Sequence, residues 1–123
     1  MKRLLLAIAM MWVAACAWAA DLSAISSAFK AGNAGKLSAV MDKEVDMALP
    51  NGTKKCDGKA AVTLLSDFFK AHKPTGFTIA HHADKKESGF LVGKLPTASG
   101  EYRVNITYRT EGNTAIIQSI RIE

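Results

Sequence analysis

The sequence is poor in the residues that form covalent crosslinks and rigid turns. Among its 123 residues are only two cysteines and three prolines. Cys16 lies in an N-terminal segment that we expect to be removed, so Cys56 is left alone and an intramolecular disulfide is excluded. We interpret Cys56 as a small, partly buried side chain. A hydrophobic core must therefore hold the domain together, and a chain of this length can bury one.

The chain also lacks every common motif of catalysis and cofactor binding. It has no glycine-rich phosphate loop, no G-x-S-x-G elbow, no H-E-x-x-H helix and no zinc-ligand spacing. The formal net charge is +5, and the lysine pairs at 54–55 and 85–86 have no aromatic side chains among them. A charge this modest is weak support for nucleic-acid binding. We expect no cofactor, no metal and no nucleic-acid partner.

One hydrophobic run is present, and it lies at the N-terminus. Residues 1–3 are a short basic start, residues 4–15 are apolar, and Ala17, Trp18 and Ala19 fit the small-x-small cleavage pattern. This order predicts a signal peptide over residues 1–19, export to the periplasm or beyond, and a single domain over residues 20–123. The run is shorter than the roughly 20 residues of a membrane-spanning helix.

A second interpretation of the same segment stays open. Residues 13–16 fit a lipobox, at which a bacterial lipoprotein is cut before its cysteine and acylated on it. The alternative to a soluble exported domain is therefore a membrane-anchored lipoprotein that begins at Cys16.

Apolar stripes with helical spacing predict two helices, at about residues 22–31 and 58–72. The second is the main helix, capped by Asp57. Its stripe recurs at i, i+3, i+4, i+7 and i+8, on Ala61, Leu64, Leu65, Phe68 and Phe69. Between the two, the sequence predicts a short helix at about 36–41, a strand at 44–49 and a brief return strand at 53–56.

The last third of the chain predicts a four-strand antiparallel meander. The expected strands are residues 77–81, 90–95, 101–110 and 114–123, separated by polar breaks and a Gly112-Asn113 turn. The third strand alternates cleanly, with Tyr102, Val104, Ile106 and Tyr108 on one face. Helices grouped early and strands grouped late predict an α+β domain, with the helices packed on one face of an antiparallel sheet.

This order of elements is similar to the nuclear transport factor 2-like superfamily, also called cystatin-like or SnoaL-like. More closely, the chain resembles a family of small exported bacterial proteins of unknown function within it. The resemblance rests on ISSAFKAGN at 25–33, LLSDFF at 64–69, YRV at 102–104 and IQSIRIE at 117–123. It implies a strongly curved sheet that wraps the long helix into a cone. It implies no activity, because fold alone does not transfer function.

Four polar-tipped side chains are predicted to face the inside of the cone. His81 shares its parity with Phe77 and Ile79, and Tyr102, Tyr108 and Gln118 follow the apolar positions of their strands. Together they are candidate pocket residues, and His81 is a candidate general base. The alternative is that each is an ordinary core or rim side chain. His82 and Asp84, on the other face, are interpreted as solvated.

The sequence favours a non-catalytic binding domain with a small apolar or amphipathic ligand in the cone. One alternative is an isomerase, dehydratase or cyclase that uses His81 as base and Tyr102 or Tyr108 as donor. The other is a pocketless homodimer, joined through the polar positions of the central strand, which are Arg103, Asn105, Thr107 and Arg109.

Overall fold

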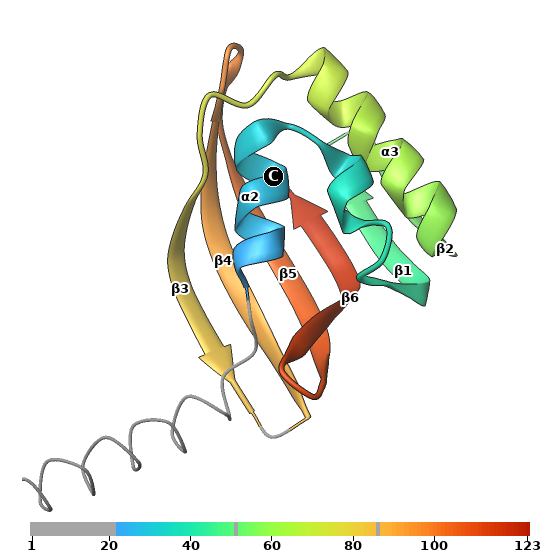
Figure 1. Cartoon of the computed structure of the whole chain (residues 1–123). Coiled ribbons are helices and arrows are strands. Elements are labelled where there is room, and N and C mark those ends of the chain that lie inside the picture. Colours follow the sequence, from blue (N-terminus) through green and yellow to red (C-terminus); the bar gives the residue numbers. More distant parts are fainter. Residues whose placement is uncertain (1–21, 51, 86) are drawn as a thin grey trace, which may run out of the picture.

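The computed structural model describes residues 22–50, 52–85 and 87–123. The predicted signal peptide, the lipobox and the cleavage site lie outside these residues. Two helices cover one face of a curved six-stranded sheet (Figure 1). The helical elements are α2 (Ser23–Ala31), the 3-10 turn η1 (Ala34–Leu37) and α3 (Gly58–Ala71). The strands are β1 (Met41–Leu49), β2 (Gly52–Asp57), β3 (Thr78–Asp84), β4 (Ser88–Thr97), β5 (Gly100–Glu111) and β6 (Thr114–Ile122).

The sheet has the order β2-β1-β6-β5-β4-β3. Strands β3 to β6 pair successively and antiparallel, which confirms the predicted meander. The α+β class and the cone are confirmed as well. The sheet is mixed rather than wholly antiparallel, because β1 runs parallel to β6. This pairing joins strands about 70 residues apart, so no local signal in the sequence could reveal it.

Helix α3 has the N-terminal cap and most of the buried apolar stripe that its sequence predicts. The Asp57 carboxylate accepts the N–H of Ala60 at 2.7 Å and caps the first turn. The buried face is Ala61, Leu65, Phe68 and Phe69, which confirms most of the predicted stripe; Leu64 is half-buried. The helix ends at Ala71, where the N–H of His72 still reaches the carbonyl of Phe68 at 2.8 Å.

The prediction of a helix at residues 36–41 is wrong. Asn33 caps a single 3-10 turn by accepting the N–H of Gly35 at 3.1 Å, and Leu37 is fully buried. The chain then enters the sheet, because the N–H of Ile117 donates to the carbonyl of Val40 at 2.7 Å. Pairing with β6 therefore outweighs a weak helical pattern, and Met41 begins β1.

Two β-bulges reverse the predicted facing of His81 and Gln118. In β3, Ile79 pairs with Gly93 but His81 pairs with Val92, so Ala80 is an extra residue. In β6, Ser119 pairs with Thr107 but Ile117 pairs with Tyr108, so Gln118 is the extra residue. A bulge shifts the alternation by one. Both side chains are consequently exposed, and the inward orientation predicted for them is wrong.

The space between the helices and the sheet is filled by large apolar side chains. Phe29 contacts Phe69 edge-on at 5.4 Å and Phe77 at 5.1 Å between ring centroids. Leu91 and Ile106 close the sheet side with no exposed surface. Tyr108 is the one hydroxyl-bearing side chain buried in the described part of the chain, and no charged side chain is buried there. No helix within that part is long and apolar enough to cross a membrane.

Candidate functional site

A small pocket opens at the C-terminal end of α3, where the helix meets the end of β1. Its volume is about 220 Å³. Most of its wall is apolar, with Asp67 and His72 as the polar exceptions. The lining residues are Leu49, Pro50, Leu64, Asp67, Phe68, Ala71 and His72. An apolar hollow with a few polar groups is the usual form of a ligand site. We refer to this hollow as the α3-end pocket.

Two aromatic rings hold the imidazole of His72 in place. Phe68 lies one turn earlier on α3, and its ring centroid is 4.9 Å from that of His72. Tyr102, from β5, lies 5.3 Å from His72 and meets Phe68 edge-on at 5.3 Å. The three rings pack against one another, so the imidazole has little freedom to rotate away from the pocket wall.

Hydroxyl groups from the β4–β5 turn complete the surroundings of His72. Its Nδ1 lies 2.5 Å from Ser99 Oγ and 3.3 Å from the Tyr102 hydroxyl. Ser99 Oγ in turn lies 3.2 Å from Thr97 Oγ1, which donates to the carbonyl of Gly100 at 2.7 Å. Helix and hairpin are thus joined by a chain of polar contacts beside the pocket.

The predicted pocket residues are not brought together in one place. Tyr102 is half-buried and lies beside the α3-end pocket, as the third member of its aromatic cluster. Tyr108 faces inward, as its parity predicts, but it is fully buried at the other end of β5. There its hydroxyl donates to Asp84 Oδ1, and His82 Nδ1 lies 3.5 Å from Asp84 Oδ2. Burial first, then the hydrogen bond to Asp84, raises the pKa of Tyr108 well above its usual range.

His81 and Gln118 lie on the outer face of the sheet. The imidazole of His81 packs on the ring of Phe90 at 5.7 Å, away from the apolar interior. Gln118 contacts Asp42 there. Neither residue lines the α3-end pocket.

His72 and Ser99 were missed by sequence reasoning. In the sequence, His72 follows a helix among Lys70 and Lys73, which indicates only a cation suited to the helix dipole. Ser99 lies in a turn 27 residues further on. Their meeting depends on how the β4–β5 turn packs against the C-terminal end of α3, which the local sequence pattern does not encode.

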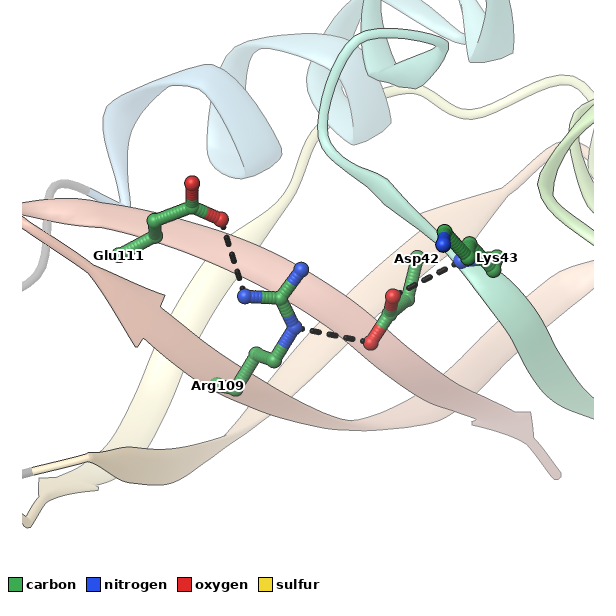
Figure 2. Close-up of polar contacts among 4 residues, drawn as sticks. All are labelled: Asp42, Lys43, Arg109 and Glu111. Carbon is green, nitrogen blue, oxygen red and sulfur yellow. Dashed lines mark hydrogen bonds and ion pairs between the residues drawn. The ribbon is translucent and has the colours of Figure 1, made fainter.

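The outer face of the sheet carries a different set of polar groups. Figure 2 shows Arg109 between two carboxylates, with its Nε 3.0 Å from Asp42 Oδ2 and its Nη1 2.9 Å from Glu111 Oε2. Arg109 and the N–H of Lys43 hold the pKa of Asp42 below its usual range. Glu111 is exposed and Arg109 and Asp42 are partly exposed, so the ion pairs add little to stability.

A second, larger hollow is formed by residues of β3, β4 and β5 and by the C-terminal residue. Its volume is about 440 Å³. It is lined by Ala80, Val92, Gly93, Lys94, Glu101, Tyr102, Arg103 and Glu123. Two cationic and two anionic side chains contribute to its wall, whereas Asp67 and His72 are the only polar side chains among the described residues that line the α3-end pocket.

No metal or redox site is evident in the residues that the structure describes. Within them, no group of three or more His, Cys, Asp or Glu side chains could hold a metal ion. Cys56 is a free thiol, half-buried, with its Sγ 3.7 Å from the carbonyl of Val45. Burial raises the pKa of this thiol, which makes it less reactive.

Comparison with known families decides the membership of the chain. Residues 22–123 match DUF4783, a domain of unknown function. The chain belongs to the DUF4783 family. Two solved DUF4783 proteins are similar to it. The one from Bacteroides uniformis is 35% identical, with a TM-score of 0.77 over 82% of this chain and 94% of the other. The one from Bacteroides ovatus is 32% identical, with a TM-score of 0.74 over 80% and 89%.

More distant structures share the fold of the DUF4783 domain. An NTF-2 like protein of unknown function from Silicibacter pomeroyi has a TM-score of 0.62 at 12% identity, over 83% of this chain and 87% of the other. At that identity the likeness shows the fold alone. It confirms a DUF4783 domain with a nuclear transport factor 2-like fold. No curated protein matches the chain.

Proposed function

We propose that this DUF4783 domain is a non-catalytic binding module, which takes a small amphipathic ligand in the α3-end pocket. One observation carries the proposal: the pocket is mainly apolar, yet His72 and Asp67 stand in its wall. The predicted ligand site in the middle of the cone is replaced by a site at its end, because Phe29, Leu91 and Ile106 occupy the middle.

The size of the pocket limits the ligand. About 220 Å³ is less than the roughly 300–1,000 Å³ of pockets for drug-sized molecules. A short alkyl chain with one polar head matches this space. The apolar chain would contact Leu64 and Phe68, and the head would meet His72 or Asp67.

The experiment is a titration with 1-hexanol, followed by amide chemical shifts in NMR. Ala71 lies in the pocket wall, and its side chain is exposed. Ala71→Leu should fill part of the pocket and weaken binding about tenfold, equivalent to about 1.4 kcal/mol. Ala24→Leu is the matched control, since Ala24 is an exposed alanine on helix α2. Equal binding by both variants, or no binding by the unmodified domain, would contradict the proposal.

The catalytic alternative lacks the geometry on which it depended. His81 lies on the outer face, and Tyr102 and Tyr108 lie at opposite ends of β5. A base and a donor within reach of one cavity are what such an enzyme needs. We therefore propose binding rather than isomerase, dehydratase or cyclase chemistry.

A homodimer through the outer face is a second candidate. The observation in its favour is Phe90, the one large hydrophobic side chain that is exposed in the described part of the chain, at 37%. It lies on the same face as Arg103, Asn105, Thr107 and Arg109. Sedimentation should show a dimer that Phe90→Ser dissociates. A monomer at all concentrations would exclude this candidate.

Export also remains part of the proposal. Trp12 and Trp18 are the only two tryptophans, so a domain cut after Ala19 contains none. A lipoprotein that begins at Cys16 would keep Trp18 and carry acyl mass on the cysteine. Intact mass and intrinsic fluorescence of protein from its native host distinguish the two. Tyrosine-only emission supports the soluble exported form, and tryptophan emission with acyl mass supports the anchored form.

A further inference from the structure

The hydroxyl groups beside the α3-end pocket favour one position for the proton of His72. Each serine or threonine hydroxyl has one proton to donate. Thr97 donates its proton to the carbonyl of Gly100 at 2.7 Å. Because the Thr97 proton is used there, we assign Ser99 as the donor in the contact of 3.2 Å between Thr97 Oγ1 and Ser99 Oγ. Ser99 then has no proton left for His72, so His72 Nδ1 donates to Ser99 Oγ at 2.5 Å.

The proton on Nδ1 determines the role of the other ring nitrogen. A neutral imidazole carries one N–H, so Nε2 of His72 holds a lone pair and is an acceptor. Nε2 has no hydrogen-bond partner among the residues that the structure describes. The longer contact of 3.3 Å with the Tyr102 hydroxyl is on Nδ1 as well. His72 therefore offers an acceptor at the wall of the pocket.

The rest of the polar wall is acceptor too. The carboxylate of Asp67 accepts hydrogen bonds and donates none. The pocket lies on the last turn of α3, where carbonyl groups without helical partners make the helix end partly negative. Lys70 and Lys73 are not in this wall: they line a separate crevice with Ala31 and Gly32 of the α2 end.

We infer that the α3-end pocket selects an amphipathic amine: a short apolar chain with a cationic ammonium head that donates to His72 Nε2 and Asp67. The inference rests on the proposed function and names its ligand class. An ammonium group has three donors and no acceptor, which is the complement of this wall. A carboxylate head would face two acceptors and a negative charge.

The test compares hexylamine, 1-hexanol and hexanoate in the same NMR titration at constant ionic strength. At mildly alkaline pH an alkylammonium keeps its positive charge and hexanoate keeps its negative charge. Hexylamine should bind most tightly and hexanoate least, with about a tenfold difference for each step. Hexanoate binding as tightly as hexylamine would overturn the amine assignment and leave the proposed function standing. Failure of all three to bind would overturn both.

Two further measurements keep the inference independent of one titration. Asp67 is exposed, so Asp67→Asn should fold normally. It should weaken hexylamine about tenfold and 1-hexanol much less, because only the ammonium loses a charge–charge attraction. An equal loss for both would contradict a charge-based preference. Nitrogen-15 shifts of His72 should show the proton on Nδ1. A proton on Nε2 would overturn the assignment of an acceptor there. The Ser99→Ala variant should then lose the Nδ1 preference if the hydroxyl chain enforces it.

Discussion

The two faces of the sheet differ in burial and in polarity. On the inner face, Val104, Ile106 and Tyr108 of β5 are fully buried. On the outer face of the same strand, Arg109 makes partly exposed ion pairs, and the hydroxyl of Thr107 shares a hydrogen bond with that of Ser119 on β6. Packing therefore determines the fold from the inner face, while the outer face and the ends of the cone remain free to carry function.

The largest difference between the faces should be seen at neighbouring residues of β5. Ile106→Ala removes apolar volume from a fully buried site, and we expect a loss of ~2–5 kcal/mol in the free energy of unfolding. Asn105→Ala, on the outer face, should cost ~0.5 kcal/mol. Urea denaturation measures both. Similar losses at the two positions would show that the outer face is packed as well, and would break the comparison.

A smaller loss of stability is expected when a side-chain atom is added at Gly93, which is closely packed against Phe77 on the inner face. A Cβ added to Gly93 would lie 2.4 Å from Phe77 Cζ, so Gly93→Ala forces the ring to move. We expect a loss of ~1–3 kcal/mol from overpacking. Gly76→Ala is the control, because its nearest neighbour would be Pro96 Cγ at 3.7 Å, an ordinary contact. If thermal unfolding shows Gly93→Ala to be as stable as the control, the inner face is looser than described.

The next prediction concerns the inner-face polar contact between Tyr108 and Asp84. Tyr108→Phe removes one hydrogen bond to a carboxylate and should cost ~1–2 kcal/mol. The pKa of Tyr108 is raised in the fold, so its contribution is complete below the unfolded value of about 10 and is lost as the pH rises above it. Unfolding measured against pH should therefore be less alkali-sensitive in Tyr108→Phe. Tyr102→Phe serves as the control, and an unchanged alkaline slope in Tyr108→Phe would contradict the account.

The smallest effect belongs to the outer-face ion pairs. The pKa of Asp42 is lowered in the fold, chiefly by Arg109, so any stabilisation is present above the ordinary value of 3.8 and is lost as the pH falls through the folded value. Arg109→Gln should raise the pKa of Asp42, as NMR titration of its carboxyl would show. Stability at neutral pH should barely change. A marked loss that persists in high salt would indicate that these groups are buried in solution.

The sequence predicted elements well wherever one face alternates without interruption. The pattern of Tyr102, Val104, Ile106 and Tyr108 identified β5 and its buried side. The alternation mispredicts which side chains face inward beyond each bulge. One extra residue, Ala80 in β3 or Gln118 in β6, moves the following side chains to the opposite face, and the sequence carries no mark of the insertion. His81 was therefore assigned inward when it lies outside.

The candidate site could be predicted only in part. Tyr102 was among the predicted pocket residues because its strand alternates regularly. His72 and Ser99 carry no local signal, since they meet through the packing of a hairpin turn on a helix end. The closed interior was equally hidden: the residues that fill it were predicted to be buried, but how completely Phe29, Phe69 and Phe77 occupy the cone depends on three-dimensional packing.

The most direct test of the account is to map where 1-hexanol contacts the domain, using nuclear Overhauser effects to labelled methyl groups. The account predicts contacts to Leu49, Leu64 and Ala71, which line the α3-end pocket, and none to Leu91, Ile106 or Ile117 in the closed interior. Contacts to the interior methyl groups, without contacts at the α3 end, would contradict the account, because the ligand would then lie inside the cone.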